Sequence, residues 1–315
     1  MNGKKLKVCT HLDSWKNVKN PVITTGTFDG VHLGHKKIIS RLKEIAEKND
    51  GETVLFTFSP HPRTVLFPDD TNIKMLNTQS EKIALLEEAG IDHLVIFPFT
   101  KEFSRLSAVE YVRDILVNKL HISKLVIGYD HHFGRNREGS IANLKELAPL
   151  YGFEVEEIPA QEVDDIKVSS TKIRTALQQG DVYAANTYLG YRYHLSGLVV
   201  SGQKVGREIG FPTANIQVMD AQKLIPADGV YAVKVKTKSG FFDGMLNIGL
   251  RPTVSEPEGK RTIEVNIFDF SNELYNEILH IEFINKIRNE VKFDNVEQLR
   301  KQLEKDKEQA KKLLA

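Results

Sequence analysis

Two histidines near the N-terminus have a spacing typical of a site for phosphate chemistry. His32 and His35 stand in the run 26–35 (GTFDGVHLGH), between a β-branched segment, residues 22–25, and an amphipathic one, residues 36–48. That order predicts a strand, a glycine-rich turn and a helix, which together direct backbone N–H groups and the positive end of a helix toward a phosphate. Histidines three residues apart face the same side of the first helical turn. There they can donate hydrogen bonds to the oxygens of a reacting phosphate.

Three glycines give the same run the backbone freedom that a ligand-binding turn needs. Gly26, Gly30 and Gly34 carry no Cβ, so the main chain can bend sharply and approach a ligand closely. The alternative interpretation is that His32 and His35 are ordinary helix-start residues whose ring nitrogens bond to the backbone. This alternative requires both spacings to be accidental, and we therefore predict a phosphate site in this turn.

Other segments of the first half are candidates for the same site. Residues 59–62 (SPHP) follow a predicted strand, and their prolines fix a turn that presents His61 at the strand's carboxyl end. Residues 169–174 (SSTKIR) precede a helical run, residues 175–179, so their hydroxyls and N–H groups suit a phosphate and Arg174 suits a bidentate contact. The alternatives are a histidine without a substrate contact and a plain Ser/Thr N-cap. A basic loop, residues 128–137, follows the predicted strand 124–128. It is either a flap that closes over a phosphate or a solvated loop.

The densest polar segment of the second half is 202–215 (GQKVGREIGFPTAN). Its glycines, including Gly206 and Gly210, suit a loop that wraps a nucleotide. Thr213 and Asn215 stand two apart, so in extended backbone their oxygens face the same side. A hydroxyl and an amide carbonyl can hold Mg²⁺ there and leave positions open for phosphate oxygens. The alternative is a proline-centred turn with ordinary polar caps.

A predicted strand, 262–270 (TIEVNIFDF), places a carboxylate beside an aromatic ring. Alternation puts the aliphatic residues on a core face, and Glu264, Asn266 and Phe268 on the opposite face, where a ligand can bind. Glu264 can accept the proton of an attacking hydroxyl there. A glutamate in a strand is otherwise more often a solvated residue.

The elements that must position these residues differ between the two halves. Up to about residue 185, apolar strands alternate with helices, which indicates an α/β fold with a parallel sheet covered on both faces. Ligands of such sheets bind at the carboxyl ends of the strands, where the histidine run lies. The predicted strands are 22–25, 53–58, 92–97, 124–128 and 153–155, and the predicted helices are 36–48, 80–88, 108–120 and 141–150.

From about Arg192 the pattern is that of an antiparallel, barrel-like β domain. Strand-like runs at 193–200, 230–235 and 262–270 are separated by turns rich in Gly, Pro and Asp. Residues 295–314 form a charged amphipathic helix that we expect to pack on this barrel with its polar face solvated. We expect two domains, 1–185 and 186–315, with the boundary near residues 185–191.

Composition limits the class of protein. The 315 residues suffice for two domains, and 43 basic and 42 acidic residues give a net charge of +1. We therefore expect no nucleic-acid partner and no anionic-membrane partner. No apolar run approaches the ~18 residues of a membrane span, and the first residues lack the apolar core of a secretion signal. The single cysteine, Cys9, fits a reducing compartment. We expect a cytoplasmic protein that is a monomer or a weak homo-oligomer.

The histidine run resembles the signature of the nucleotidylyltransferase superfamily. The chain as a whole resembles the bifunctional bacterial riboflavin kinase/FMN adenylyltransferase family, also called FAD synthetase. The matching segments cover nearly the whole chain beyond residue 20 in the family's order: 26–35, 59–62, 169–174, 210–215, 247–253 (NIGLRPT) and 264–270. The resemblance implies a Rossmann-like adenylyltransferase domain, followed by a six-stranded antiparallel β-barrel kinase domain with a terminal helix.

The same resemblance implies roles for individual residues. In the first domain, His32, His35 and Arg174 would be catalytic. ATP would be bound there by Gly26, Phe28, Asp29, Gly34, Ser169, Ser170 and Thr171, and the flavin by Phe58, His61, Pro62 and Asp130. In the second domain, Glu264 would be the catalytic base. Mg·ATP would be bound by Gly206, Gly210, Thr213 and Asn215, with the metal on Thr213 and Asn215.

Four departures from the family's usual pattern bear on substrate affinity and on the balance of the two activities. His131-His132 stands where an aromatic residue and an arginine are common, and Tyr191 stands where an arginine is usual. Asn266 replaces a frequent histidine, and Asn276 replaces a frequent glycine. None of these departures removes a residue to which chemistry is assigned.

The implied function is a two-step synthesis that uses Mg²⁺ and ATP as co-substrate. The second domain phosphorylates riboflavin to FMN, and the first domain adenylylates FMN to FAD and releases pyrophosphate. One alternative is a chain with one working half, such as an FAD synthetase with a weak kinase. A cytidylyltransferase shares the histidine run but leaves the second domain unexplained. A flavin-binding regulatory protein without turnover is the alternative outside enzymes, although no basic reading surface for DNA is evident.

Overall fold

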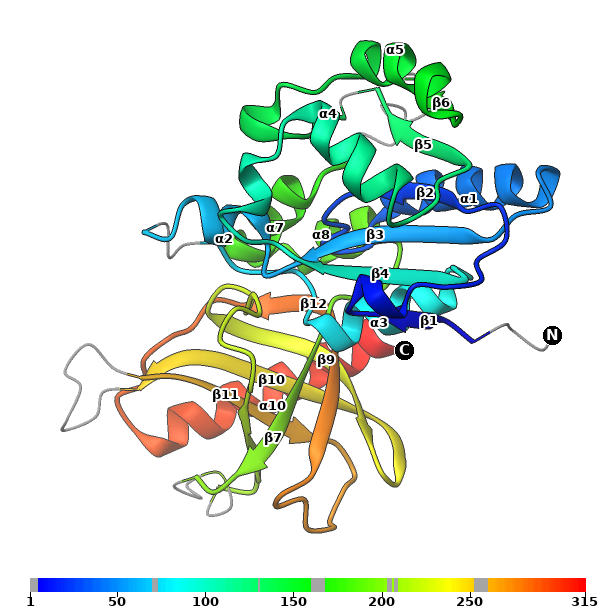
Figure 1. Cartoon of the computed structure of the whole chain (residues 1–315). Helices are drawn as coiled ribbons and strands as arrows, with labels where there is room; N and C mark the ends of the chain where they lie inside the picture. The colour runs from blue at the N-terminus through cyan, green and yellow to red at the C-terminus, as the bar shows by residue number, and fades with distance from the viewer. Residues whose placement is uncertain are drawn as a thin grey trace. The chain divides into compact units, whose positions relative to one another are not determined.

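The computed structural model describes residues 5–69, 73–129, 131–159, 168–202, 206, 209–251 and 260–315. Contacts within the chain divide it into two compact units, Met1–Ser169 and Ser170–Ala315. The first unit is built on an open sheet and the second on a closed barrel (Figure 1). The division assigns two helices that precede the barrel strands to the second unit, whereas the boundary near residues 185–191 remains a prediction.

The first unit is a parallel sheet with helices on both faces, as the sequence predicts. The sheet order is β1-β4-β3-β2-β5-β6, and every pairing in it is parallel. The strands are β1 (Lys7–Cys9), β2 (Val22–Thr25), β3 (Thr53–Ser59), β4 (His93–Pro98), β5 (Lys124–Gly128) and β6 (Glu154–Ile158). The chain leaves β2 toward β3 on one side and reaches β5 on the other side, so the strand order reverses at β2. A reversal of this kind opens a ligand crevice at the carboxyl ends of the strands.

The helical elements of this unit fall between the strands. They are a 3₁₀ turn (Leu12–Ser14), α1 (Leu33–Lys48), α2 (Pro62–Leu66), α3 (Gln79–Glu88), a 3₁₀ turn (Phe103–Arg105), α4 (Ala108–Glu110), a π-helical segment (Tyr111–Val117), a 3₁₀ turn (Arg135–Arg137) and α5 (Ile141–Tyr151). The helix expected at 108–120 therefore begins as α4 and continues as π-helix. Its first turn is fixed by a capping box in which Ser107 and Glu110 bond each other's backbone N–H groups.

Alternate residues of the central strands enter two different cores. Ile23, Phe56 and Val95 belong to a cluster with Trp15 and the π-helical segment. Their strand neighbours Val22, Leu55 and Leu94 belong to a cluster with α1 and α3. A strand whose two faces are both buried is mostly apolar on both of them, which is why these strands appear in the sequence as largely hydrophobic runs without strict alternation.

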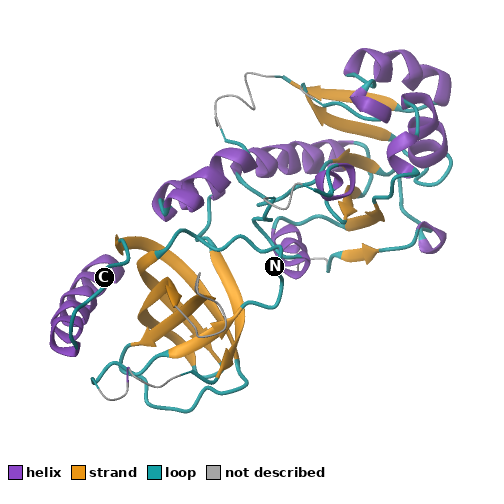
Figure 2. Cartoon of the chain, turned by 90° about the vertical axis from the view of Figure 1, so that its left-hand side faces the viewer, coloured by secondary structure: helices purple, strands orange, loops and turns teal. Residues whose placement is uncertain are grey.

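The second unit is a closed antiparallel barrel with the order β10-β11-β8-β7-β12-β9. Its strands are β7 (His194–Val200), β8 (Ala214–Gln217), β9 (Gly229–Thr237), β10 (Gly240–Arg251), β11 (Lys260–Ile267) and β12 (Ile278–Arg288). Its helices are α7 (Ser170–Gln179), α8 (Val182–Leu189) and α10 (Val296–Leu314). Figure 2 shows the strands of the barrel with α10 along its outside, which confirms the predicted barrel and terminal helix.

A buried ion pair fastens α10 to the barrel. Asp306 on α10 is 1% exposed and receives three hydrogen bonds from the Arg288 guanidinium at the end of β12, at 2.8–3.1 Å. Gln302 adds a hydrogen bond to the same carboxylate. A planar guanidinium facing a carboxylate fixes orientation as well as distance, so α10 lies on the barrel in one register.

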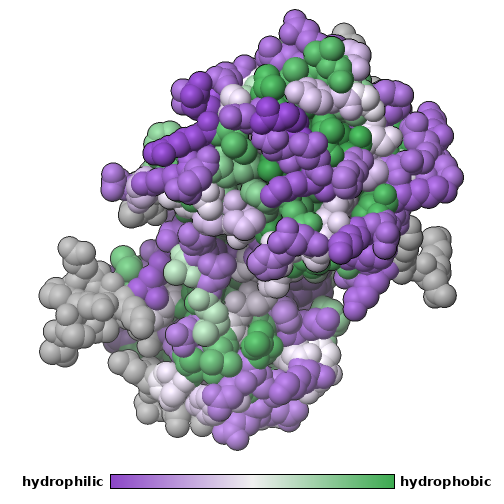
Figure 3. Space-filling view, viewed as in Figure 1, coloured by the Kyte–Doolittle hydropathy of each residue, from purple (hydrophilic) through white to green (hydrophobic). Residues whose placement is uncertain are grey.

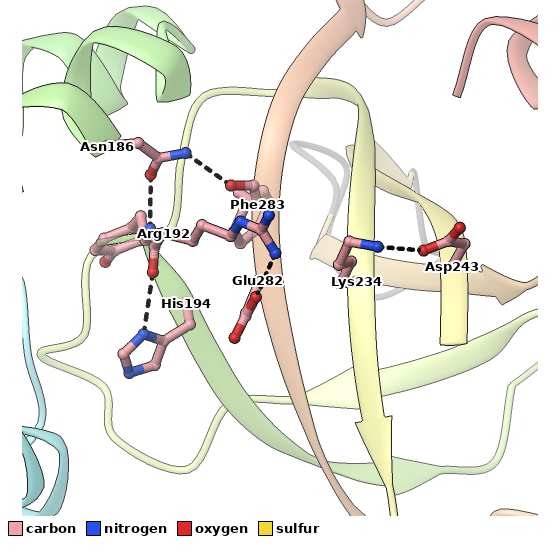
Figure 4. Close-up of polar contacts among 8 residues, drawn as sticks. Asn186, Arg192, His194, Lys234, Asp243, Glu282 and Phe283 are labelled. Carbon is pink, nitrogen blue, oxygen red and sulfur yellow. Dashed lines mark hydrogen bonds and ion pairs between the residues drawn. The ribbon is translucent and has the colours of Figure 1, made fainter. Parts of the chain in front are cut away.

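α8 is tied to the barrel through one asparagine. Asn186 donates to the Phe283 carbonyl of β12 at 2.9 Å and accepts from the Tyr193 N–H, just before β7, at 2.6 Å (Figure 4). Nearby, Arg192 pairs with Glu282 at 3.2 Å. These bonds explain why α8 clusters with the barrel although it precedes every barrel strand in sequence.

On the face shown in Figure 3, hydrophilic residues dominate, and the hydrophobic colour forms scattered patches. Within the part of the chain that the structure describes, no helix is both long and apolar enough to cross a membrane.

Two sequence-based boundaries that bear on candidate site residues are wrong. α7 begins at Ser170, so residues 170–174 lie inside this helix and do not precede it. β11 ends at Ile267, and Asp269 has a left-handed φ of 54°, so the predicted strand stops three residues short of Phe270. In the second case, apolar alternation continued through a turn, where it no longer reports an extended backbone.

Two candidate nucleotide sites

His32 and His35 lie together at the N-terminus of α1, after the carboxyl end of β2. Their rings stack with centroids 3.6 Å apart and planes 14° apart. His32 is the N-cap of α1, and its Nδ1 accepts a hydrogen bond from the backbone N–H of His35 at 3.3 Å. A neutral ring that accepts at Nδ1 carries its proton on Nε2, so Nε2 is a donor. The capping role that we weighed as an alternative therefore holds for Nδ1 of His32, and the ring proton is on Nε2.

The surroundings of His35 keep its imidazole uncharged. The ring is half-buried, its Nδ1 has no hydrogen-bond partner among the described residues, and the Phe28 ring lies 4.7 Å away between centroids. Burial, His32 and Lys82 together hold the pKa of His35 well below its ordinary value. A neutral imidazole has one nitrogen that donates and one that accepts, which suits hydrogen bonding to a phosphate without adding a full charge.

The turn between β2 and α1 is anchored from α3 and the segment before it. The buried carboxylate of Asp29 accepts from the N–H of Leu76, at 3.0 and 3.1 Å to its two oxygens, and from the N–H of Asn77 at 3.3 Å. The ammonium of Lys82 on α3 donates to the Thr27 carbonyl at 2.9 Å. Lys82 was missed in the sequence, because nothing in the pattern of helix 80–88 marks a buried charge.

Two glycines of the run are needed for close packing. A Cβ on Gly26 would lie 3.1 Å from the Phe28 ring. A Cβ on Gly34 would lie 3.2 Å from the His32 ring and 3.9 Å from the Val168 carbonyl. The chain therefore returns to the histidine turn at Val168, immediately before Ser169.

The remaining residues of 169–174 belong to α7 and the second unit. Ser170, Thr171 and Arg174 lie in the first turns of α7, whose buried residues are Ile173, Ala176 and Leu177. The structure therefore supports a link between Ser169 and the histidine turn within one unit. The roles of Ser170, Thr171 and Arg174 in binding ATP remain predictions.

An aromatic cluster surrounds the residue expected to contact flavin. Phe58, half-buried near the end of β3, lies 5.3 Å from Phe56, 5.5 Å from Phe99 and 5.7 Å from Phe103 between ring centroids. Phe99 and Phe103 were not identified from the sequence, since single aromatic residues in loops carry no periodic signal.

His61 and Pro62 form the start of α2 at the same edge of the sheet. His61 is the N-cap and accepts from the Arg63 N–H at 3.2 Å through Nδ1, and Pro62 opens the helix. Asp130, the fourth residue expected to contact flavin, lies outside the described residues.

In the barrel, the predicted residues come into direct contact. Thr213 Oγ1 donates to Glu264 Oε2 at 3.2 Å. Asn215 lies directly opposite Glu264 in the β8–β11 ladder, where a cross-strand neighbour is about 5 Å away between Cβ atoms. The Thr213 hydroxyl is thus hydrogen-bonded to the Glu264 carboxylate, and Asn215 is the ladder partner of the same glutamate.

Glycines let the preceding loop pack onto these side chains. A Cβ on Gly202 would lie 2.1 Å from Asn215 Nδ2, closer than any real contact. A Cβ on Gly206 would lie 2.2 Å from the Phe211 carbonyl and 3.5 Å from Thr213 Oγ1. Gly210 has a left-handed φ of 83°. Glycine is favoured there because it adopts this backbone conformation without steric strain.

Two pockets meet at Thr213, which lines both of them. The first is lined by apolar and polar residues in similar measure: Val199, Val200, Gly202, Pro212, Thr213, Ala214, Asn215, Val265, Ile267 and residues 270–275. The second is lined mainly by apolar residues with a few charges: Gly206, Ile209, Phe211, Thr213, Val230, Met245, Leu246, Asn247, Glu264, Asn266, Arg288, Glu290, Val291, Phe293, Leu299 and Leu303. Glu264 faces the second pocket, and its strand neighbour Val265 faces the first.

One alternative and one expectation about β11 need correction. Glu264 is 8% exposed and buried in a pocket wall, so it is not a solvated strand residue. Phe268 follows the end of β11 and packs with Met245, Phe211 and the α10 residue Ala310, so it does not line the second pocket. Strand alternation cannot be applied past the last residue of the strand.

The oxygens around Thr213 fit a hard divalent cation. The Thr213 hydroxyl and the Asn215 amide oxygen are the ligand types that Mg²⁺ prefers, and the Glu264 carboxylate hydrogen-bonds to the first of them. Thr213 is exposed and Asn215 is half-buried, which leaves room for phosphate oxygens and water.

Comparisons with known proteins agree with this geometry. A family model described as FAD synthetase matches residues 15–172, and one described as riboflavin kinase matches residues 189–314. A bifunctional riboflavin kinase/FMN adenylyltransferase of Haemophilus influenzae is 39% identical over 290 residues, covering 92% of each chain. Those of Bacillus subtilis and Escherichia coli K12 are 38% and 34% identical, covering 95% and 90% of this chain and 94% and 90% of their own.

The chain belongs to the bifunctional riboflavin kinase/FMN adenylyltransferase family. This confirms the resemblance and the order of the two domains inferred from the sequence. A crystal structure described as a macrolide-efflux protein from Streptococcus pneumoniae has the same fold, with a TM-score of 0.87, 30% identity and coverage of 97% of this chain and 98% of its own.

The departures from the family pattern have local structural explanations in two places. Asn276 has a left-handed φ of 62°, and asparagine is the residue besides glycine that most readily accepts that conformation. Asn266 donates to the Pro212 carbonyl at 2.7 Å and so holds the turn before Thr213. The Tyr191 ring lies 5.9 Å from His194, and the His131 ring stacks 6.0 Å from Phe133. Nothing in the structure explains the exposed His132.

Proposed function

We propose that this chain converts riboflavin to FMN in its barrel unit and FMN to FAD in its N-terminal unit, with the residues given below. The observation that carries the kinase half is Thr213, which lines both pockets of the barrel and hydrogen-bonds to Glu264. A group that passes between two bound molecules must be transferred where their pockets meet.

In the kinase half, the first pocket, which contains both Thr213 and Asn215, takes the nucleotide, and the second, mainly apolar pocket takes riboflavin. Gly202, Gly206 and Gly210 let the loop wrap the triphosphate, and Thr213 and Asn215 hold Mg²⁺. When bound, the metal neutralises charge on the β- and γ-phosphates. The apolar lining of the second pocket suits a flat ring system, and Glu264 faces that pocket beside Thr213.

Glu264 is the base of this step. Its carboxylate takes the proton of the terminal ribityl hydroxyl, and the resulting oxygen bonds to the γ-phosphorus of ATP. The bond between that phosphorus and the β-phosphate oxygen breaks, and ADP leaves. Thr213 orients the base through its hydrogen bond to Oε2.

In the adenylylation half, the histidine turn binds the reacting phosphates. An oxygen of the FMN phosphate bonds to the α-phosphorus of ATP, the bond to the β-phosphate oxygen breaks, and pyrophosphate leaves. His32 donates from Nε2 and His35 donates from its neutral ring, so both stabilise charge on the α-phosphate as the bonds change. The backbone N–H groups at the start of α1 add to this effect.

The other residues of this half bind the two substrates. Phe58 and its aromatic neighbours suit a flavin ring, with His61 and Pro62 at the same edge of the sheet. From the sequence alone, Asp130 is proposed to contact the flavin as well. ATP is held by Gly26, Phe28, Asp29, Gly34, Ser169, Ser170 and Thr171, and Arg174 contacts its phosphates. Asp29 contributes through the shape of the turn that its three backbone hydrogen bonds maintain.

We infer further that the enzyme works in the cytoplasm, without a nucleic-acid or membrane partner, as a monomer or weak homo-oligomer. A net charge of +1 and a single, free Cys9 support this placement.

Chromatography of flavins tests the two activities together. The protein is incubated with riboflavin, ATP and Mg²⁺, and in parallel with FMN, ATP and Mg²⁺. Both FMN and FAD are expected from riboflavin. FAD from added FMN alone indicates an inactive kinase half, and no product in either incubation indicates a flavin-binding protein without turnover.

A further inference from the structure

One lysine beside the histidine turn has no role in the two reactions as described so far. Lys82 on α3 is 7% exposed, and its ammonium donates to the Thr27 carbonyl at 2.9 Å. Burying an ammonium costs free energy unless it is paired and hydrogen-bonded. The same carbonyl also accepts a hydrogen bond from the Thr57 hydroxyl at 3.2 Å. The Thr27 carbonyl would therefore have a hydrogen-bond donor even without the Lys82 ammonium.

The turn that Lys82 holds has an unusual backbone. Phe28, Gly30 and Val31 have φ values of 47°, 90° and 36°. Left-handed conformations at residues with a Cβ cost about 1–3 kcal/mol each and persist only where the surroundings hold them. The holding contacts come from the region of α3: Lys82 binds the carbonyl before Phe28, and backbone N–H groups bind the carboxylate of Asp29.

A short chain of contacts connects Lys82 to the reacting region. Thr27 precedes Phe28, whose ring lies 4.7 Å from that of His35 between centroids. His35 in turn stacks on His32. Lys82 is also close enough to His35 for its charge to act on that ring. The charged and titratable groups that act on this arrangement are His32 from the cap of α1, Lys82 from α3 and Asp29 from the turn.

We propose that Lys82 is a positioning residue for the adenylylation step, whose ammonium fixes the strained turn and, through Phe28, the orientation of the His35 ring. This inference rests on the proposed role of His35. It makes α3, which contributes no residue to the predicted site, a structural part of the catalytic apparatus.

The test compares Lys82→Met, which removes both charge and donor, with Lys82→Gln, which keeps a neutral donor. Lys43→Met is the matched control, because Lys43 also donates to a backbone carbonyl, that of Ala89 at 3.2 Å, but on the exposed surface. His35→Ala is measured alongside. Riboflavin phosphorylation by each variant, which depends on the barrel unit, serves as the control for folding.

The expected result is a kcat for FMN adenylylation lowered about 10- to 100-fold in Lys82→Met, the size of effect that a misplacement near 1 Å produces. The KM for ATP should stay within about threefold of wild type, since Lys82 does not bind ATP in this proposal. Lys82→Gln should be intermediate. Lys43→Met should match wild type, and kinase activity should be retained throughout.

A spectroscopic readout separates positioning from a purely structural role. Removing a neighbouring positive charge stabilises the protonated form of His35, so the pKa of His35 should rise in Lys82→Met toward the ordinary value. NMR titration of the imidazole signals, with His35→Ala identifying the resonance, measures this shift. Loss of stability alone would leave the titration unchanged.

Four outcomes overturn the inference. They are an adenylylation kcat within twofold of wild type in Lys82→Met, an equal loss of both half-reactions, a raised KM for ATP with kcat unchanged, and an unshifted His35 titration. If His35→Ala is inactive in adenylylation while Lys82→Met is normal, the inference fails and the site stands. If both variants are normal, the proposed histidine site itself is wrong.

Discussion

At the scale of single residues, the two ring nitrogens of His32 have different tasks. Nδ1 caps α1 by accepting from the His35 N–H, and Nε2 carries the ring proton. An N-cap contributes about 1 kcal/mol to stability, whereas a donor to a transition state contributes to rate. In the proposed mechanism, one residue therefore combines a structural and a catalytic function, and a suitable substitution can separate them.

We predict that His32→Asn keeps the stability of the first unit but lowers FAD formation. Asparagine is a good N-cap, yet it cannot place a donor where Nε2 lies. Loss of one donor to the transition state costs about 10²–10³ in rate, and His35→Ala should show a loss of the same order. Thermal melting and the two half-reactions check this prediction. Wild-type FAD formation by both variants would leave these histidines a purely structural role.

We predict that Glu264→Gln lowers riboflavin phosphorylation by about 10²–10⁴, because the amide keeps the shape but cannot take a proton. The amide oxygen still accepts from Thr213, so the buried wall stays intact. Riboflavin binding by fluorescence and conversion of added FMN to FAD should both persist. Phosphorylation above a tenth of the wild-type rate would show that another group is the base.

At the scale of elements, a loop and a strand share one space in the barrel. The Asn215 amide occupies the space that a side chain on residue 202 would need, so the main chain can pass there only with glycine at this position. Gly202 does not have a positive φ in the left-handed region, so a substitution there tests space rather than backbone freedom. The loop and the Asn215 amide on β8 are therefore in close contact at this point.

We predict that Gly202→Ala displaces the Asn215 amide and weakens the use of Mg·ATP by the kinase half, as Asn215→Ala does. The double variant Gly202→Ala/Asn215→Ala should be no worse than Asn215→Ala alone, because the added methyl then meets no amide. Kinetics of both half-reactions at varied Mg·ATP check this, with adenylylation expected near wild type. Additive losses in the double variant would place the effect of Gly202 elsewhere.

Elements were predicted best where their two faces have the same environment. β2 and β5 match their predicted bounds because they are short runs of mostly β-branched or aliphatic residues, nearly all of them buried. β1 was missed, since Lys7 and Val8 are exposed on a three-residue edge strand and give no pattern. The start of α7 was missed because Ser and Thr favour caps as well as first turns, and residue types alone do not distinguish the two.

The candidate sites were predictable from sequence in part, for a related reason. Thr213, Asn215 and Glu264 are polar residues at positions that strand geometry relates, and the structure brings them together. Lys82 and Phe103 were not predictable, because their roles arise from tertiary packing between segments distant in sequence.

At the scale of the whole molecule, the first unit contains buried histidines that disfavour acid. The side chain of His93 is 7% exposed, and its Nε2 lies 3.3 Å from Glu52 Oε1. Burial lowers the pKa of His93, with a partial offset from Glu52, and the pKa of His35 is lowered as well. A histidine whose folded pKa is lowered binds its proton more readily in the unfolded chain.

We predict that the first unit loses stability as pH falls through about 6.5, the ordinary histidine pKa, and goes on losing it until the lowered folded pKa values are reached. Each histidine contributes at most about 1.4 kcal/mol per pH unit. Denaturant unfolding at pH 7.5 and 5.5, followed by fluorescence of Trp15, the single tryptophan of the chain, measures this. His93→Gln should reduce the difference between the two pH values, and an unchanged difference would contradict the assignment.

Thr213 lies in the wall of both pockets of the barrel, and this has a stereochemical consequence. Donor and acceptor must occupy the barrel at the same time, so initial-rate lines for riboflavin and ATP should intersect rather than run parallel. The phosphoryl group then moves once, in line, from one oxygen to the other. With ATP made chiral at its γ-phosphorus by sulfur and oxygen isotopes, the FMN analogue that forms should have the inverted configuration, whereas relay through an enzyme-bound phosphate would return the original one.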